Sequence, residues 1–330
     1  MIALFKQKSP ANVAVLFIFG LLIKIPLFLY SVPLQATATD GGLYPYFSSL
    51  LGLTESNSSA SAFVAFLILY VQALMLNHYV NEYRMTTHQT FLPAMAYLLV
   101  TSLLPEWSYL SPQLVAATLI IWAFGKLFRL YNQQAAKGIV YNIGLIVGFS
   151  SFIFFPSAAF LLTLCLGMAI LKPFRFNELV LMLIGALTPY YFYAVYLFLV
   201  DQLTPDRIIP NVTIGLPDMR MSASIIIVAI LLFVPFFVGA AYIRGHLRRM
   251  LIQVRKNWTL LVLYLITAMA IPFINADNRL HNWLFMTAPF AAFHSSAYLY
   301  PKKRWISLGI FFATVAFILV MQFVKLGWKV

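Results

Sequence analysis

The stretch from Ser222 to Ile243 reads SASIIIVAILLFVPFFVGAAYI and contains no charged side chain. A run of about 20 apolar residues is long enough to cross the hydrocarbon core of a bilayer as an α-helix. The run ends at a basic segment, RGHLRR, from Arg244 to Arg249. Lys and Arg are retained on the cytoplasmic side of membrane proteins, so this segment predicts a transmembrane helix and also its direction.

Similar apolar runs separated by polar breaks recur along the whole chain and predict about eleven transmembrane helices. The predicted spans are 11–31, 60–80, 90–104, 112–129, 138–155, 157–171, 179–200, 222–243, 258–274, 282–298 and 306–324. The third and the sixth are short, which predicts tilted, broken or re-entrant helices. The expected fold class is therefore an all-α integral membrane protein, with residues 1–330 forming a single polytopic membrane domain.

The composition agrees with a protein that uses lipid as its solvent. Of the 330 residues, 62% are hydrophobic and only 9% are charged, whereas a soluble domain has roughly a quarter charged residues. The net charge of +13 would suggest a nucleic-acid partner for a soluble protein. In a membrane protein the placement of the cations matters more, and no nucleic acid is expected to bind. The single cysteine, Cys165, excludes an internal disulfide and a cysteine zinc site.

The cations separate clearly when the N-terminus is placed in the cytoplasm. Sixteen of the 22 Lys and Arg then fall in inner segments and five fall in outer ones. Most carboxylates fall outside. The sequence thus predicts a cytoplasmic N-terminus and an outer C-terminus.

The motifs of common soluble enzymes do not occur in the sequence. There is no GxxxxGK[ST], HExxH or GxSxG pattern and no pair of histidines at metal spacing. No cofactor and no metal site are therefore expected.

The first outer segment, 32–59, is the best candidate for chemistry. Asp40 precedes Gly41 and Gly42, where the backbone can turn sharply. Residues 43–51 mix aromatic, apolar and serine positions, which predicts a short interfacial helix. Asp40 could meet a lipid-linked substrate at the headgroup level, or it could simply cap a turn.

Two later outer segments carry cations that could hold a phosphate. Arg279 and His281 lie between the ninth and tenth predicted helices, and Arg207 and Arg220 lie between the seventh and eighth. A guanidinium binds phosphate bidentately, and a histidine can shuttle a proton. The alternative is that both segments are solvated loops with weak ion pairs.

Within the predicted helices, Lys24, Tyr190 and Tyr193 are the further candidates. Lys24 lies inside the first span, where ionisable groups usually face the protein interior, although a lysine can also snorkel to the interface. Tyr190 and Tyr193 share a face of the seventh helix and could stack on sugars or prenyl chains. An interfacial tyrosine belt is the competing interpretation.

The longest inner segment, 244–257, is basic and amphipathic. We expect it to bind anionic lipid headgroups. The cations concerned are Arg244, Arg248, Arg249, Arg255 and Lys256.

Several motifs resemble those of an uncharacterised family of bacterial polytopic membrane proteins. They are Phe91-Leu-Pro93, Pro105-Glu106, Ser111-Pro112, Leu127-Phe-Arg129-Leu-Tyr131-Asn132, Lys172-Pro-Phe-Arg175-Phe-Asn-Glu178, Gly185 and Thr188-Pro189-Tyr190. That resemblance implies a bacterial inner-membrane location and no particular activity.

At the level of architecture the chain is also similar to the GT-C glycosyltransferases, which use polyprenyl-phosphate sugars. Asp40 and residues 43–51 match the acidic first outer loop and the interfacial helix of that superfamily, and Arg279 matches its late outer arginine. The usual pair of acids in the first loop is absent.

The GT-C resemblance implies an inner-membrane enzyme that acts at the outer leaflet on a polyprenyl-phosphate lipid, with Asp40 as general base and Arg279 on the phosphate. Two alternatives stay open: a lipid or small-solute transporter or flippase, and a non-catalytic membrane subunit of a larger envelope assembly.

Overall fold

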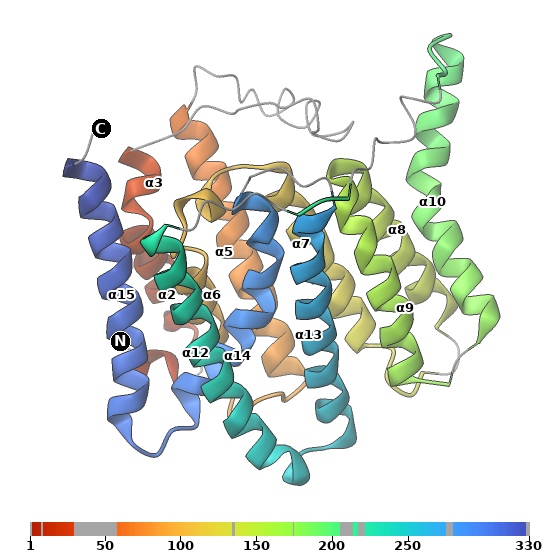
Figure 1. Ribbon diagram of the computed structural model, residues 1–330. Coiled ribbons are helices and arrows are strands. Elements are labelled where there is room, and N and C mark those ends of the chain that lie inside the picture. The colour runs from red at the N-terminus through yellow and green to blue at the C-terminus, as the bar shows by residue number, and fades with distance from the viewer. Residues whose placement is uncertain are drawn as a thin grey trace.

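The computed structural model describes residues 2–7, 9–29, 58–133, 136–173, 175–204, 214–216, 222–274 and 280–327. Within these ranges the secondary structure is helical apart from one isolated antiparallel bridge, between Ile214 and Ile274. The α-helices are α1 (Ile2–Phe5), α2 (Ala11–Ile23), α3 (Ile25–Leu29), α5 (Ser58–Glu82), α6 (Leu92–Val100), α7 (Pro112–Phe128), α8 (Lys137–Ile153), α9 (Ala159–Leu171), α10 (Phe176–Leu199), α12 (Ala223–His246), α13 (Ile252–Ala270), α14 (Thr287–Leu299) and α15 (Arg304–Gly327). Figure 1 shows that the long helices run side by side as one bundle.

The prediction of an all-α, multi-pass membrane protein is confirmed. In the described part of the chain each predicted span overlaps helical structure, although the spans 11–31 and 282–298 are each divided between two elements. Among the described residues, five segments are long and apolar enough to cross a membrane: Ser59–Glu82, Phe176–Leu199, Ala223–His246, Ile252–Phe273 and Arg304–Met321. Four shorter apolar helices accompany them: Ala11–Ile23, Pro112–Phe128, Lys137–Ile153 and Phe155–Leu171. The number of crossings and the interfacial helix at 43–51, which lies outside the described residues, stay predictions.

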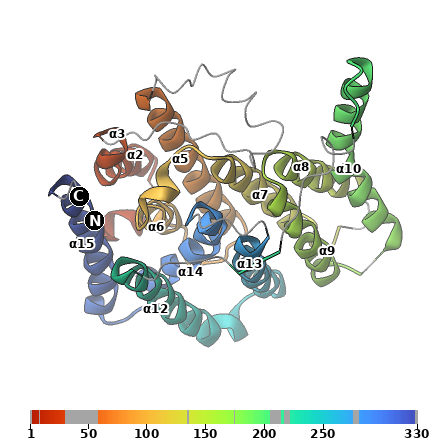
Figure 2. The same ribbon diagram turned by 45° about the horizontal axis from the view of Figure 1, so that its top comes forward.

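The helices α6 and α14 form the centre of the bundle. Every residue of α6 is buried, and α14 is buried from Thr287 to Tyr298. Figure 2 shows both helices enclosed by their neighbours, among them α12, α13 and α5. At 9 and 13 residues these two helices are shorter than a bilayer core is thick, given a rise of about 1.5 Å per residue. They can be this short because other protein segments surround them.

Polar side chains connect the central helices. The hydroxyl of Tyr97 on α6 donates to Oε1 of Gln72 on α5 at 2.6 Å. In turn Nε2 of Gln72 donates to Oγ1 of Thr118 on α7 at 2.6 Å. Hydrogen bonds between helices help to hold a bundle together where lipid offers no hydrophobic driving force.

The peripheral helix α10 is attached differently, by backbone approach to α8. A Cβ at Gly144 would lie 2.0 Å from the carbonyl oxygen of Met182, and one at Gly185 would lie 2.4 Å from that of Tyr141. Only glycine fits at such a crossing, which is the small-residue packing of membrane helices. The rest of α10 is largely exposed, and in Figure 1 it stands at the edge of the bundle.

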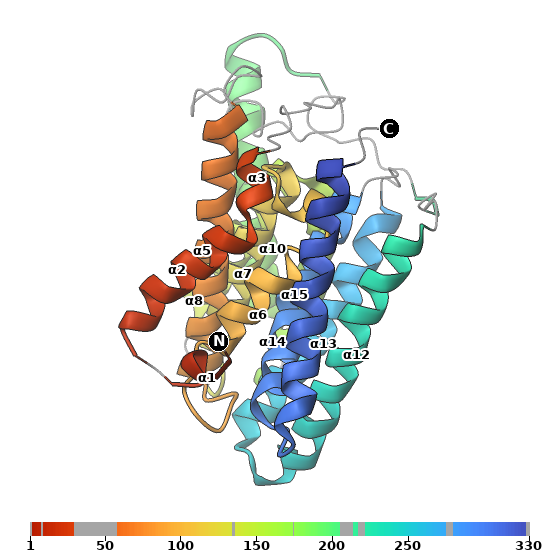
Figure 3. The same ribbon diagram turned by 90° about the vertical axis from the view of Figure 1, so that its left-hand side faces the viewer.

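The first predicted span, 11–31, is interrupted at Lys24. Position 26 is a proline, which has no N–H with which to continue the helical hydrogen-bond ladder. The helix α2 therefore ends at Ile23, and the N–H of Leu27 donates to the carbonyl of Lys24 at 2.9 Å. Figure 3 shows α2 lying oblique to α15.

The predicted inner segment 244–257 is shorter than expected. The helix α12 continues to His246 and α13 begins at Ile252, with a 3₁₀ turn, η3 (Leu247–Arg249), between them. Arg and Lys are good helix formers, and their long stems carry the charge to water from a helical position.

Two ends of the bundle are used as reference points below. We call one the basic end; its helices are joined at loops 83–91, 129–136, 172–175, 247–251 and 300–303. We call the other the opposite end; it carries Lys24, the 3₁₀ turns η1 (Pro105–Ser108) and η5 (Leu280–Met286), and the described residues 200–204 and 214–216.

Candidate functional site

Lys24 lies buried at the opposite end of the bundle. Lys24 is 2% exposed, and its ammonium group donates to Oγ of Ser108 at 2.8 Å. Ser108 in turn donates to the carbonyl of Thr101 at 3.1 Å. The side chain thus turns into the protein. Among the described residues its one hydrogen-bond partner is neutral, and a buried cation without an anion is costly.

The turn that holds Ser108 is joined to the turn that follows Arg279. Nε1 of Trp107 in η1 donates to the carbonyl of Leu280, the first residue of η5, at 2.9 Å. Nε2 of Gln113 at the start of α7 donates to Oδ1 of Asn282 at 3.0 Å. The turn that begins at Leu280 therefore lies beside the turn that holds Ser108. His281 lies within the same η5 turn and is half-buried.

The isolated bridge joins two further segments at this end of the bundle. Ile214 pairs with Ile274, and the N–H of Gly215 donates to the carbonyl of Phe273 at 3.1 Å. Ile214 lies between Arg207 and Arg220 in the sequence.

Four of the predicted site residues lie outside the described residues: Asp40, Arg207, Arg220 and Arg279. Their placement stays a prediction. The described residues next to these segments in the sequence lie at the opposite end of the bundle. Leu29 and Ser58 bound the segment with Asp40, while Ile274 and Leu280 bound the segment with Arg279.

Glu106 is not among the site residues predicted from the sequence. It lies in η1, next to Trp107, and its Oε2 atom is buried and accepts no hydrogen bond from any described residue. Burial and this carboxylate together raise the pKa of the neighbouring Tyr109. The signal that could have identified η1 is the break Pro105-Glu106-Trp107-Ser108, with a proline and a carboxylate, between the third and fourth predicted spans.

Tyr190 and Tyr193 pack against α8 rather than beside Lys24. The hydroxyl of Tyr190 donates to Oγ of Ser151 at 3.0 Å. Both rings meet Phe152 edge-on, with centroids 5.4 Å away for Tyr190 and 4.8 Å away for Tyr193. These contacts give both side chains a packing role, and their contact with a sugar or prenyl chain stays a prediction.

The basic segment is only partly free to meet lipid. Arg244, Arg249 and Arg255 are exposed. Lys256 instead donates to the carbonyl of Leu171 at 3.3 Å, at the end of α9, and lies over the ring of Tyr131. A cation at a helix C-terminus is favoured by the helix dipole. The side chain of Arg248 lies outside the described part of the chain.

The described residues contain no group of three or more His, Cys, Asp or Glu side chains that could hold a metal ion.

Comparison with known proteins identifies a fold but no family. No family model and no curated protein matches the chain. The crystal structure of the Archaeoglobus fulgidus oligosaccharyltransferase, tethered with an acceptor peptide, is similar with a TM-score of 0.52 at 12% identity, over 95% of this chain and 55% of that chain. A crystal structure of the same enzyme with Zn and sulfate gives a TM-score of 0.42 at 12% identity, over 95% and 51%.

This chain spans about half the length of the oligosaccharyltransferase chain that it resembles. At this identity the likeness shows a similar fold and no more. The resemblance to a bacterial family of membrane proteins stays a prediction.

Proposed function

We propose that this protein is a GT-C-like glycosyltransferase that uses a polyprenyl-phosphate-linked sugar. The observation that carries the proposal is the fold likeness to an oligosaccharyltransferase, which extends over 95% of the chain. It is supported by the contacts that join Lys24, η1 and η5 at one end of the bundle.

We further propose about eleven crossings of a bacterial inner membrane, with the N-terminus in the cytoplasm and the C-terminus outside. The basic end would then face the cytoplasm, as the distribution of Lys and Arg favours. The opposite end would lie at the outer leaflet, where the first outer segment contributes Asp40 and an interfacial helix at 43–51.

In the proposed reaction an acceptor hydroxyl attacks the anomeric carbon of the sugar. A new glycosidic C–O bond forms, the bond between that carbon and the phosphate oxygen breaks, and the polyprenyl phosphate leaves. Asp40 would take the proton of the hydroxyl as general base. Arg279, helped by Lys24, would stabilise the negative charge that develops on the leaving phosphate. Arg207, Arg220 and His281 would line the rim of the same site.

The direct test measures release of polyprenyl phosphate by the purified protein in nanodiscs, with a panel of polyprenyl-phosphate sugars and the membrane lipids and glycans of bacteria as acceptors. Turnover should occur with at least one donor and fall roughly 10²- to 10⁴-fold in Asp40→Asn, which keeps the shape and removes the base. Asp201→Asn is the matched control, since Asp201 is an exposed acid at the same end of the bundle. Equal loss in both variants, or full activity in Asp40→Asn, would reject Asp40 as the base.

Two other outcomes would redirect the proposal. Substrate flux across proteoliposomes without any turnover would favour a transporter or flippase. Stable co-purification of an envelope enzyme, with neither flux nor turnover, would favour a membrane subunit, for which the exposed face of α10 offers a surface.

A further inference from the structure

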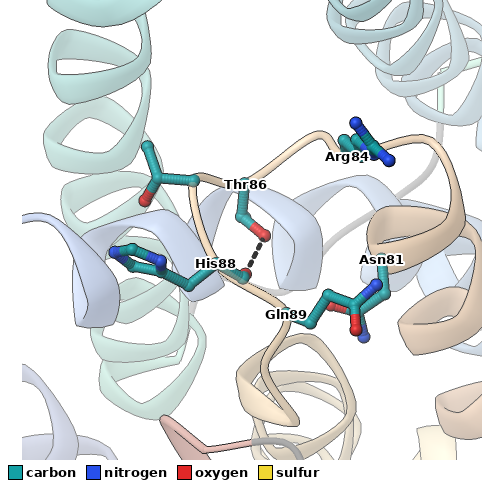
Figure 4. A pocket seen from close by; sticks show the side chains of 6 residues that line it. Asn81, Arg84, Thr86, His88 and Gln89 are labelled. Carbon is teal, nitrogen blue, oxygen red and sulfur yellow. Dashed lines mark hydrogen bonds between the residues drawn. The ribbon is translucent and has the colours of Figure 1, made fainter.

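A polar pocket opens at the basic end, in the loop between α5 and α6. Its volume is about 350 Å³, and it is lined by Asn81, Arg84, Thr86, Thr87, His88 and Gln89. Figure 4 shows Thr86 folded back onto the loop, with Asn81 and Gln89 on one side and His88 on the other. The volume falls in the range of small-molecule sites, roughly 300–1,000 Å³. None of these lining residues carries a carboxylate, so the described lining favours an anion.

The backbone holds Arg84 in an unusual conformation. The N–H of Arg84 donates to the carbonyl of Asn81 at 3.2 Å, and that of Met85 donates to the carbonyl of Val80 at 2.9 Å. This pair of bonds is the Schellman motif that ends many helices, and the residue at the position of Arg84 is usually glycine. Arg84 adopts the left-handed conformation that the motif requires, with φ of 48°. The strained backbone conformation thus fixes Arg84, which is positively charged, at the edge of the pocket.

Arg84 is exposed, and no described carboxylate forms an ion pair with it. Its neighbour Glu82 is instead bonded to Nε2 of His78, one turn earlier on α5, at 2.6 Å. The guanidinium therefore keeps its donors for a ligand. The loop itself adds the exposed side chains of Thr87 and His88.

The two ends of the loop are clamped to each other. Nδ2 of Asn81 donates to the carbonyl of Thr90 at 2.8 Å, and the N–H of Thr90 donates to Oδ1 of Asn81 at 2.9 Å. Within the loop, Oγ1 of Thr86 donates to the carbonyl of His88 at 2.8 Å. These bonds set the shape of the pocket before any ligand enters.

Neighbouring helices hold the loop from outside. Nε1 of Trp258 on α13 donates to the carbonyl of Met85 at 3.1 Å. The N–H of Thr87 donates to the hydroxyl oxygen of Tyr300 at 3.3 Å, and the Tyr300 ring stacks on His246 with centroids 4.7 Å apart. Burial raises the pKa of Tyr300, so this hydroxyl stays neutral at physiological pH. A preorganised site loses little entropy on binding.

We propose that this pocket binds a phosphate group, held by the guanidinium of Arg84 together with polar groups of the loop that line the same pocket. Exposed cations elsewhere at the basic end, such as Arg249 and Lys303, add a positive potential that attracts anions. This site lies at the other end of the bundle from Lys24 and stands independently of the proposed glycosyl transfer. The phosphate could belong to a lipid headgroup or to a free phosphate compound, because both present the same oxygens.

The test titrates inorganic phosphate into the purified protein in micelles of a phosphate-free maltoside detergent at constant ionic strength, by calorimetry and by thermal shift. Wild type should bind saturably, whereas chloride should have no effect. Arg84→Gly should bind at least about tenfold more weakly and still fold, because glycine suits this backbone position. Arg84→Gln, which keeps the strained backbone but removes the charge, should show the same loss.

The matched control is Arg249→Gln, which removes an exposed cation at the same end outside the pocket. Wild-type affinity in this variant supports the pocket, and an equal loss in both variants would reduce the effect to general electrostatics and overturn the proposal. Absence of saturable phosphate binding by wild type would overturn it as well. Repeating the titration in phosphatidylglycerol nanodiscs separates the sources: lost binding of inorganic phosphate identifies the lipid headgroup, and unchanged binding identifies a free phosphate compound.

Discussion

The two ends of the bundle hold their candidate cations in contrasting ways. Lys24 is buried at the opposite end, with the neutral hydroxyl of Ser108 as its partner, in a place where a charge is expensive. Arg84 is exposed at the basic end, where its charge costs little but its backbone conformation is strained. The burial of Lys24 therefore suggests a function at the opposite end, and the backbone conformation of Arg84 suggests a function at the basic end. The two kinds of cost predict different results when each cation is removed.

The largest effect is expected for Lys24→Leu. This change removes a buried charge, so the free energy of unfolding should stay the same or rise, by about 1–4 kcal/mol at most. Turnover should nevertheless fall roughly tenfold to a hundredfold, because a cation near the leaving phosphate is lost. Thermal unfolding and the polyprenyl-phosphate release assay measure the two quantities. Wild-type turnover in this variant would remove Lys24 from the site.

Ser108→Ala should produce the opposite pattern at the same place. The variant leaves the ammonium group of Lys24 buried without its hydrogen-bond acceptor, which costs about 1–3 kcal/mol of stability. In the Lys24→Leu background, Ser108→Ala should cost much less stability than it does in the wild type. An equal cost of Ser108→Ala in both backgrounds would show that the two side chains do not interact.

A smaller effect is expected at the basic end for Trp258→Phe. The change removes the indole N–H that donates to Met85 and keeps most of the ring packing, so stability should fall by about 1 kcal/mol. Amide hydrogen exchange should increase at residues 85–90 and much less at η1. Uniform exchange across the bundle would mean that Trp258 does not hold the loop in particular.

The smallest effect, and one of opposite sign, is expected for Arg84→Gly. Relief of the left-handed conformation should raise the free energy of unfolding by about 0.5–1 kcal/mol in the absence of ligand. Arg249→Gly, in the 3₁₀ turn η3, should instead lower stability or leave it unchanged. A lower melting temperature for Arg84→Gly than for Arg249→Gly would refute the strain at position 84.

The fold class could be predicted from the sequence because the length and apolar character of each run can be read directly along the chain. A run such as 222–243 is too long and too apolar for anything except a membrane or a core helix, so each predicted span overlaps helical structure in the described part of the chain. Helix ends were less predictable where basic residues extend a helix, as at Arg255 in α13, because helix propensity and snorkelling outweigh polarity there. The central position of α6 could not be predicted, because it depends on which helices surround α6 in the folded bundle.

The candidate sites depend on contacts that sequence spacing does not encode. Lys24 and Ser108 are 84 residues apart, and Trp107 and Leu280 are 173 residues apart. The pocket beside Arg84 depends on a helix cap in which Arg84 takes the position that is usually glycine. No sequence motif predicts such a cap. Sequence reasoning identified Lys24 by its depth in the first span and passed over Glu106 and Arg84, since both lie among ordinary loop residues.

In the proposed active site, Asp40 and Arg279 face one cavity at the opposite end of the bundle. Cross-linking of Asp40→Cys with Arg279→Cys in a Cys165→Ser background, using bismaleimides of graded length, tests this arrangement. Efficient cross-linking is expected with reagents of about 12 Å or shorter, a span that accommodates one sugar–phosphate unit in near-attack geometry. Cross-linking only by reagents about twice that length, or none at all while a 107–280 cysteine pair reacts readily, would contradict it.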